Sequence, residues 1–239
     1  MNVASSGVEM GNPGSNLPVA NKSAWARAKK LPWLVIAIIC LASVLRIVGL
    51  GRNSLWLDEA YQVWASKNNV ASILQITIHA DTHPPLYYLL LHYWMLGFGQ
   101  SEVAVRSLSA CLGIITVALV YFVGRDLFNR RTGLVASFLL AISVFAIWIS
   151  QEARPYSLLM PLTVLSFLFF VRLLRADRPN WTLCVLYSLA NIVLLYTHIY
   201  AVFIVASQVL FILLFRKTYA KVQTAFWASL VATVIAFSP

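Results

Sequence analysis

Two adjacent carboxylates, Asp58 and Glu59, are the first candidates for chemistry in this sequence. They follow an apolar stretch at residues 31–50 and stand between Trp56 and Tyr61. Neighbouring negative charges at such a boundary repel each other and lose part of their hydration, which costs free energy. A solvated loop or a helix N-terminus would also account for them. The functional interpretation makes Asp58 a general base for a hydroxyl, or makes both residues ligands of a divalent cation such as Mg²⁺ or Mn²⁺.

A second cluster combines Asp81 and His83 with two consecutive prolines, Pro84 and Pro85. The prolines fix the backbone and end any preceding helix, so they form a rigid turn. A carboxylate and an imidazole two residues apart could orient a substrate or contribute to a metal site. An ordinary interfacial turn accounts for the spacing equally well, since two or three ligands do not define a metal site.

Two further polar sites stand between apolar stretches. Glu152 and Arg154 share the short segment 150–157, where they could form a salt bridge. Arg154 could instead bind a phosphate, because a guanidinium makes two parallel hydrogen bonds to phosphate oxygens. His198 lies between Tyr196 and Tyr200, and a lone histidine in such a setting is more often an interfacial polar residue than a catalyst.

The composition predicts a membrane protein. The chain has 239 residues, of which 60% are hydrophobic and 11% charged, whereas soluble proteins carry about 25% charged residues. Its net charge of +10 comes from short basic clusters between apolar stretches, so nucleic-acid binding is not expected. The three cysteines all lie in apolar stretches, which argues against a disulfide framework. Local motifs of nucleotide-binding proteins and of common hydrolases are absent from the sequence.

Apolar stretches predict an all-α polytopic membrane protein with about seven transmembrane helices and interfacial helices in the first outer loop. A spanning helix takes about 20 residues. The predicted spans are residues 31–50, 107–124, 132–151, 155–171, 181–196, 201–215 and 222–239. The segment 86–98 is too short to cross, so it is expected to be interfacial or re-entrant. Residues 1–30 are predicted to form a flexible basic tail.

Lys and Arg clusters predict the orientation, because cytoplasmic loops hold the excess of positive charge. The clusters are Lys22, Arg27, Lys29 and Lys30; Arg125, Arg130 and Arg131; Arg172, Arg175 and Arg178; and Arg216, Lys217 and Lys221. With these in the cytoplasm, the N-terminus is cytoplasmic and the outer loop 51–106 is extracytoplasmic. The same holds for the 152–154 turn and for His198. All candidate residues then share one face of the plasma (inner) membrane, where we expect an active site.

Four motifs in this order resemble the multi-pass GT-C glycosyltransferases. The nearest branch holds the protein O-mannosyltransferases, the lipid A aminoarabinose transferase and the rhizobial lipopolysaccharide core transferases. The motifs are Leu55-Trp56-Leu57-Asp58-Glu59-Ala60, His83-Pro84-Pro85-Leu86-Tyr87-Tyr88, Gly124-Arg125-Asp126-Leu127-Phe128 and Ser150-Gln151-Glu152-Ala153-Arg154-Pro155-Tyr156-Ser157. The resemblance covers residues 31–239.

The resemblance implies a glycosyltransferase that takes a hexose or pentose from a polyprenyl-phosphate carrier. It implies transfer with inversion, at the outer face, to an envelope lipid, glycan or protein. Asp58 then matches the acid that acts as base or orients the acceptor, with Glu59 beside it. The predicted substrate-binding residues are Asp81, His83, Glu152, Arg154 and His198. His83 matches the turn of the acceptor pocket, and Glu152 and Arg154 match the loop near the carrier phosphate.

One alternative is a carrier-binding protein or flippase that performs no chemistry. It would bind the carrier phosphate through Arg52, Arg106 and Arg154. The spans carry no central acid of the kind that transporters commonly use, which disfavours this alternative. Relatives usually continue well beyond residue 239, so residues 31–239 are expected to be an incomplete glycosyltransferase module that lacks part of the donor site.

Overall fold

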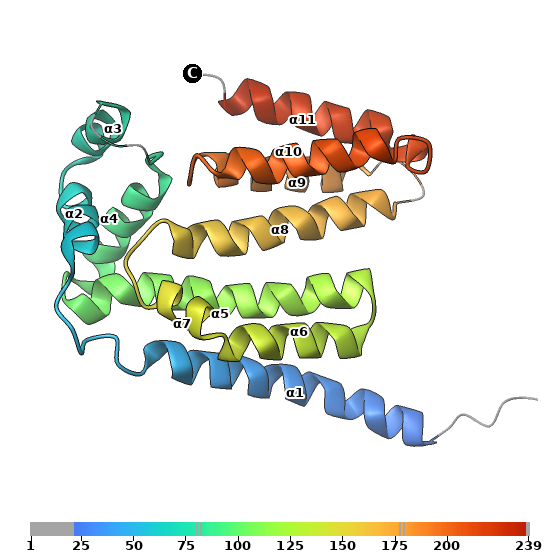
Figure 1. The fold of residues 1–239 in the computed structure, drawn as a ribbon, viewed down its shortest axis with the longest axis horizontal. Coiled ribbons are helices and arrows are strands. Elements are labelled where there is room, and N and C mark those ends of the chain that lie inside the picture. The colour runs from blue at the N-terminus through green and yellow to red at the C-terminus, as the bar shows by residue number, and fades with distance from the viewer. Residues whose placement is uncertain (1–21, 80, 82, 177, 179, 238–239) are drawn as a thin grey trace, which may run out of the picture.

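The structure is a computed structural model that describes residues 22–79, 81, 83–176, 178 and 180–237, with side chains from Trp33 onward. These residues form eleven α-helices and one short 3₁₀ helix, which confirms the all-α class. Seven of the helices run side by side as an elongated bundle (Figure 1). They are α1 (Lys22–Ile47), α5 (Glu102–Leu127), α6 (Arg130–Ile142), α8 (Tyr156–Leu174), α9 (Trp181–Leu195), α10 (Ala201–Leu214) and α11 (Gln223–Phe237).

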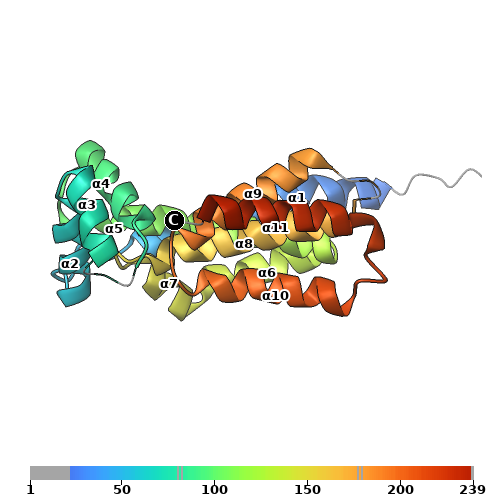
Figure 2. The same ribbon diagram turned by 90° about the horizontal axis from the view of Figure 1, so that it is seen from above.

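Three shorter helices gather at one end of this bundle. They are α2 (Leu57–Ser66), α3 (Val70–His79) and α4 (Leu86–Phe98), and two perpendicular views show the same arrangement (Figures 1 and 2). The chain leaves α11 at this end, whereas α1 begins at the opposite end. The turns that follow α5, α8 and α10 all lie at that opposite end, as the positions of the basic clusters predict. Its assignment to the cytoplasm stays a prediction.

Each predicted span corresponds to a helix or a helix pair, but the predicted count of seven is not confirmed. In the described residues three helical segments are long and apolar enough to cross a membrane: Glu102–Leu127, Tyr156–Leu174 and Ala220–Phe237. A bent pair makes a fourth. The apolar helices Trp33–Ile47, Trp181–Leu195 and Ala201–Leu214 are shorter. Residues 22–30 of the predicted tail belong to α1, and residues 1–21 lie outside the described residues.

The predicted span at residues 132–151 is not one straight helix. It consists of α6 and α7 (Val144–Ser150), which meet at Ser143 with a bend of 64°. Ser143 has an extended backbone, and its hydroxyl accepts a hydrogen bond from the backbone N–H of Ala146 (3.4 Å). The break leaves the last carbonyls of α6 without their usual partners four residues on, and the carbonyl of Leu140 accepts only from the backbone N–H of Ser143 (3.4 Å) within the chain's own turn. The buried guanidinium of Arg46 donates to two of them, those of Leu140 (3.2 Å) and Ala141 (3.1 Å).

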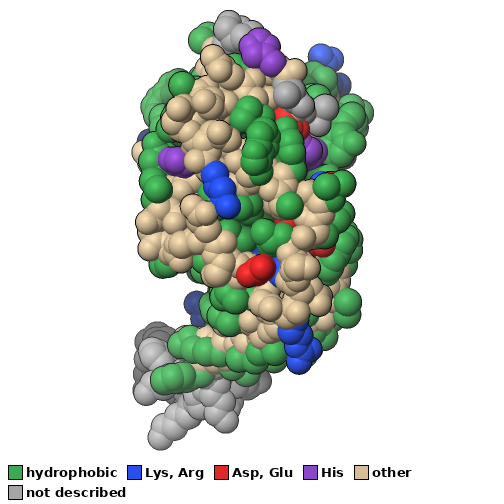
Figure 3. Space-filling view, turned by 90° about the vertical axis from the view of Figure 1, so that its left-hand side faces the viewer, with side chains coloured by type: hydrophobic (Ala, Val, Ile, Leu, Met, Phe, Trp, Pro, Cys, Tyr) green, Lys and Arg blue, Asp and Glu red, His purple; other side chains and the backbone are tan. Residues whose placement is uncertain are grey.

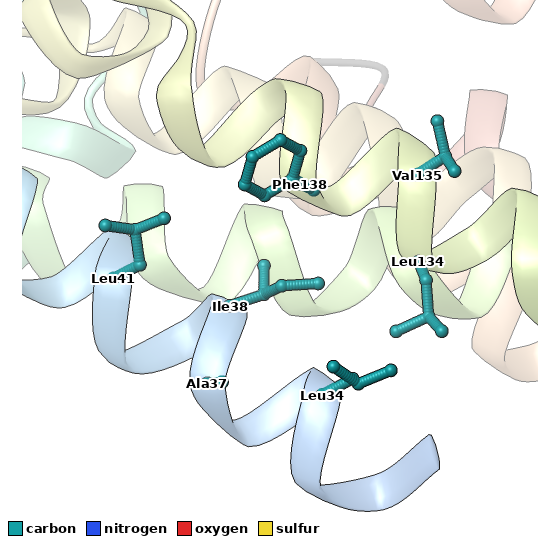
Figure 4. Close-up of a pocket in the computed structure, with 7 residues that line it drawn as sticks. All are labelled: Leu34, Ala37, Ile38, Leu41, Leu134, Val135 and Phe138. Atoms are coloured by element: carbon teal, nitrogen blue, oxygen red, sulfur yellow. The ribbon is translucent and has the colours of Figure 1, made fainter. Parts of the chain in front are cut away.

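The flanks of the bundle are apolar. A groove of about 400 Å³ between α1 and α6 is an example (Figure 4). Its lining is entirely hydrophobic: Leu34, Ala37, Ile38, Leu41, Leu134, Val135 and Phe138. Such a surface suits hydrocarbon and offers no group for chemistry, so the functional site lies elsewhere.

Gly113 allows α5 to approach Ser150, the last residue of α7, and Arg46 of α1. A Cβ atom at this position would overlap the Ser150 side chain and lie 3.0 Å from Nε of Arg46. Both neighbours are buried. The glycine is therefore required by close packing rather than by backbone conformation.

We expect Gly113→Ala to destabilise the protein by about 1–3 kcal/mol, the usual cost of an overpacked core. Thermal unfolding of the detergent-solubilised protein would show a lower midpoint. Gly97→Ala is the matched control, because an added Cβ at Gly97 meets no atom within 4 Å. Equal midpoints for the two variants would contradict the packing argument.

Candidate active site

The candidate residues meet at the end of the bundle that carries α2, α3 and α4. Viewed from this end, charged and histidine side chains lie among hydrophobic ones (Figure 3). A cavity of about 500 Å³ opens here. Its lining residues are Leu57, Asp58, Tyr61, Gln62, Asp81, His83 and Arg154. The fold thus brings residues from three of the four polar sites of the sequence to one cavity.

A buried ion pair between Glu59 and Arg106 connects the elements that surround this cavity. Nη2 and Nε of Arg106 donate to the two carboxylate oxygens of Glu59 at 2.6 and 2.9 Å. The backbone N–H of Ala153 donates to the same carboxylate (2.9 Å). Arg106 also donates to the carbonyls of Leu50 (2.8 Å) and Asn53 (2.7 Å). Glu59 has no exposed surface, so the geometry favours a positioning role. Its catalytic role stays a prediction.

Asp58 pairs with Arg154 at the wall of the cavity, with 2.8 Å between Oδ2 and Nη1. Arg154 therefore binds Asp58 rather than the neighbouring Glu152. The Asp58 side chain is 44% exposed, so it is open to a substrate. The guanidinium of Arg154 lies over the rings of Trp56 (5.2 Å) and Tyr156 (5.1 Å). These aromatic faces attract the cation and hold it in place.

Asp81 and His83 form a hydrogen-bonded pair beside the cavity. One oxygen of Asp81 accepts from the backbone N–H of His83 (3.0 Å) and contacts its Nδ1 (2.9 Å). The other oxygen accepts from the hydroxyl of Tyr88. Burial opposes ionisation of Asp81, but the bonds from Tyr88 and His83 outweigh it, and the pKa of Asp81 is lowered. Asp81 is therefore an anion at neutral pH.

His198 lies behind His83 rather than in the lining of the cavity. The two imidazoles meet edge to face at 4.9 Å, and His198 also contacts the ring of Tyr156 (5.1 Å). Its Nδ1 accepts a hydrogen bond from the backbone N–H of Tyr200 (3.1 Å). Burial, and then the proximity of His83 and Arg154, lower the pKa of His198. A neutral His198 thus supports His83, and its substrate contact stays a prediction.

Glu152 lines a second, smaller cavity of about 170 Å³. The other lining residues are Phe145, Trp148, Ile149, Arg154 and Tyr156. Arg154 therefore borders both cavities. Burial, and then the negative charge of Glu59, raise the pKa of Glu152 despite the opposing effect of Arg154.

The predicted divalent cation finds no ready set of ligands. Asp58 and Glu59 bind different arginines, so the two carboxylates do not act as a pair. In the part of the chain that the structure describes, no three His, Cys, Asp or Glu residues could hold a metal together. A cation stays a prediction.

The sequence pattern assigns no such role to three polar residues of the site. Gln62 lies four residues after Asp58, a spacing that places both on one face of α2, so the helical period could have indicated it. Tyr88 matches an interfacial aromatic residue by sequence but is buried and bonded to Asp81. Arg106 was expected only in a phosphate-binding set, whereas it binds Glu59.

The family model of the dolichyl-phosphate-mannose–protein mannosyltransferases matches residues 82–239. The chain belongs to this family. The sequence resemblance to the protein O-mannosyltransferase branch is thereby confirmed, and the protein is a multi-pass membrane protein. A search of curated protein sequences found no match.

The fold is similar to that of a solved family structure, the protein O-mannosyltransferase Pmt1–Pmt2 complex of S. cerevisiae bound to the sugar donor. The two chains superpose with a TM-score of 0.69 at 20% sequence identity. The match covers 87% of this chain and 32% of the yeast chain. This chain thus spans about a third of the length of that relative.

We expect Glu59→Gln to destabilise the protein strongly, because it leaves Arg106 as an uncompensated buried charge. Breaking a buried pair in this way costs about 3–5 kcal/mol. Thermal unfolding in detergent measures the loss. Glu102→Gln is the control, since Glu102 is exposed and surface changes usually stay within about 0.5 kcal/mol. Equal effects of the two variants would show that the Glu59 pair contributes nothing.

We expect Glu152→Gln to stabilise the protein at neutral pH. A raised pKa means that the folded state disfavours the Glu152 carboxylate, so its contribution is favourable below the unfolded-state pKa and lost as pH rises through the folded-state pKa. The variant should unfold at a higher temperature than the native protein at pH 7. The difference should shrink toward about pH 4, near the ordinary pKa of glutamate. A difference independent of pH would contradict this reasoning.

Proposed function

We propose that this protein is a glycosyltransferase that takes a sugar from a polyprenyl-phosphate carrier and transfers it to a hydroxyl of a cell-envelope acceptor. Transfer occurs at the extracytoplasmic face and inverts the anomeric centre. The observation that carries the proposal is a partly exposed carboxylate, Asp58, paired with an arginine that borders two adjoining cavities. Membership of the mannosyltransferase family supports a lipid-phosphate sugar as the donor.

The two cavities suit the two substrates. The smaller one is lined mainly by aromatic and aliphatic side chains, with Arg154 and Glu152 as its charged groups. We assign it to the sugar phosphate, since Arg154 can bind phosphate oxygens while aromatic faces cover the sugar. The larger one holds Asp58, Asp81 and His83. We assign it to the acceptor, which needs polar groups to orient its hydroxyl.

The reaction then requires one base and one group that stabilises the leaving phosphate. The acceptor oxygen attacks the anomeric carbon while its proton passes to the carboxylate of Asp58. The bond between the anomeric carbon and the phosphate oxygen breaks, and its electron pair stays on that oxygen. Arg154 stabilises the charge that develops there. Attack from the face opposite the phosphate inverts the sugar, by the logic of inverting glycosidases.

The flippase alternative loses its phosphate-binding set in this structure. That set requires Arg52, Arg106 and Arg154 together. Arg106 is instead buried, and it donates its hydrogen bonds to Glu59 and to backbone carbonyls. An arginine bound in this way cannot also bind a carrier phosphate. Transfer chemistry is therefore the function that the geometry favours.

We expect Asp58→Asn to reduce sugar transfer by about 10²–10⁴-fold, the usual contribution of a general base. The substitution is made in the native gene, and membrane abundance is verified. Mass spectrometry of polyprenyl-phosphate sugars and envelope glycans then measures the effect. Accumulated donor together with one missing glycan residue is the expected result.

Glu102→Gln serves as the matched control, because Glu102 is an exposed acid at the same end of the bundle. It should leave both profiles unchanged. Unchanged profiles for Asp58→Asn at equal abundance would refute the role of Asp58. Passage of intact carrier sugar across sealed vesicles, without release of free polyprenyl phosphate, would instead favour a flippase.

A further inference from the structure

The larger cavity contains an unused hydrogen-bonding atom on a buried side chain. Gln62 is 3% exposed and lines the cavity. Its Oε1 is buried and has no hydrogen-bond partner within the described residues. A buried carbonyl without a hydrogen-bond partner costs free energy. A ligand that donates a hydrogen bond to this oxygen would remove that cost and bind more tightly.

The amide of Gln62 leaves its oxygen, Oε1, without a partner among the described residues. Tyr88 donates its hydroxyl proton to Asp81, so the oxygen of Tyr88 is left as an acceptor. Burial and Asp81 raise the pKa of Tyr88, whereas Gln62 lowers it, as an NH₂ group facing this oxygen would do. This orientation leaves Oε1 of Gln62 for a ligand.

The same chain of bonds fixes the tautomer of His83. Asp81 is ionised and can only accept, so Nδ1 of His83 carries the proton of their 2.9 Å contact. With Nδ1 engaged by Asp81, Nε2 is the ring nitrogen left for a ligand, and in the neutral ring this atom holds the lone pair. His83 lines the cavity, so its ring can meet the acceptor substrate there.

We propose that Gln62 and His83 bind the acceptor substrate as paired hydrogen-bond acceptors, held in place by Tyr88 and Asp81. This inference rests on the proposed function, because it concerns the same cavity. Gln62 is then a substrate-binding residue, whereas Tyr88 and Asp81 are positioning residues.

The pairing also indicates the class of acceptor. The cavity lining has two carboxylates, Asp58 and Asp81, against one guanidinium, Arg154. With the acceptor atoms of Gln62 and His83 added, it favours a ligand that supplies N–H or O–H donors. An acceptor with a negative charge next to its reacting hydroxyl is disfavoured by the same groups.

Steady-state kinetics on membranes containing the full chain test this inference. The probes are polyprenyl-phosphate mannose and a neutral synthetic peptide with one threonine. Gln62→Met removes the amide at similar volume. His83→Asn keeps a group that can bond to Asp81 but deletes Nε2. Gln75→Met and His79→Asn are the controls, because both residues are exposed on α3.

Loss of one hydrogen bond should raise KM for the peptide by about five- to tenfold in each site variant. KM for the donor should stay unchanged, as should both constants in the controls. His83→Gln places an amide near the position of Nε2, so it should recover part of the loss. A second peptide with glutamate beside the threonine should have a higher KM than the neutral one in the native protein.

Three results would overturn the inference: an unchanged peptide KM in both site variants, equal rises in the KM of donor and peptide, or equal behaviour of His83→Asn and His83→Gln. A purely structural role would produce the last two. Failure of the proposed function looks different. In that case the native protein would transfer no mannose to peptide or envelope acceptor, and Asp58→Asn would change nothing.

Discussion

The buried ion pair between Glu59 and Arg106 is the constraint on which the rest of the site depends. Two charges withdrawn from water are tolerated only when their hydrogen bonds are satisfied, and here the backbone supplies the remaining partners. Ala153 donates to Glu59, and the carbonyls of Leu50 and Asn53 accept from Arg106. One pair therefore joins α2, α5, the segment before α2 and the turn before α8.

The exposed pair that faces the cavity follows from the buried one. Asp58 precedes Glu59 on α2, and successive side chains on a helix point about 100° apart. When Glu59 faces the interior, Asp58 is therefore turned elsewhere and stays partly exposed. Arg154 follows Ala153 in the turn that Glu59 holds, so it arrives beside Asp58. The site thus separates a buried carboxylate that holds the structure together from a partly exposed one that faces the cavity.

A second group of contacts holds the turn before α8 from the side of the bundle. The amide of Gln151 donates to the carbonyls at the end of α1, including that of Val48 at 3.0 Å. Arg46 satisfies the carbonyls left free where α6 ends at Ser143. Gly113 makes room for Ser150, the last residue of α7, and for Arg46. The turn that carries Arg154 is therefore held against the end of α1 by Gln151.

The sequence alone determined the helical class, the apolar segments, the gathering of candidate residues at one end and the family motifs. The helical class and the apolar segments follow from hydrophobicity along the chain. The gathering of candidate residues at one end follows because successive spans run in opposite directions.

Only the tertiary structure decided the partners: Arg154 with Asp58, Arg106 with Glu59, and Gln62 beside Tyr88. It also decided the break at Ser143, which a long uncharged segment does not reveal. The two ion pairs join residues more than 40 positions apart, and no local pattern specifies which faces of distant helices will meet. Packing decides which faces meet, because buried charges are stable only in an arrangement that satisfies all of their hydrogen bonds.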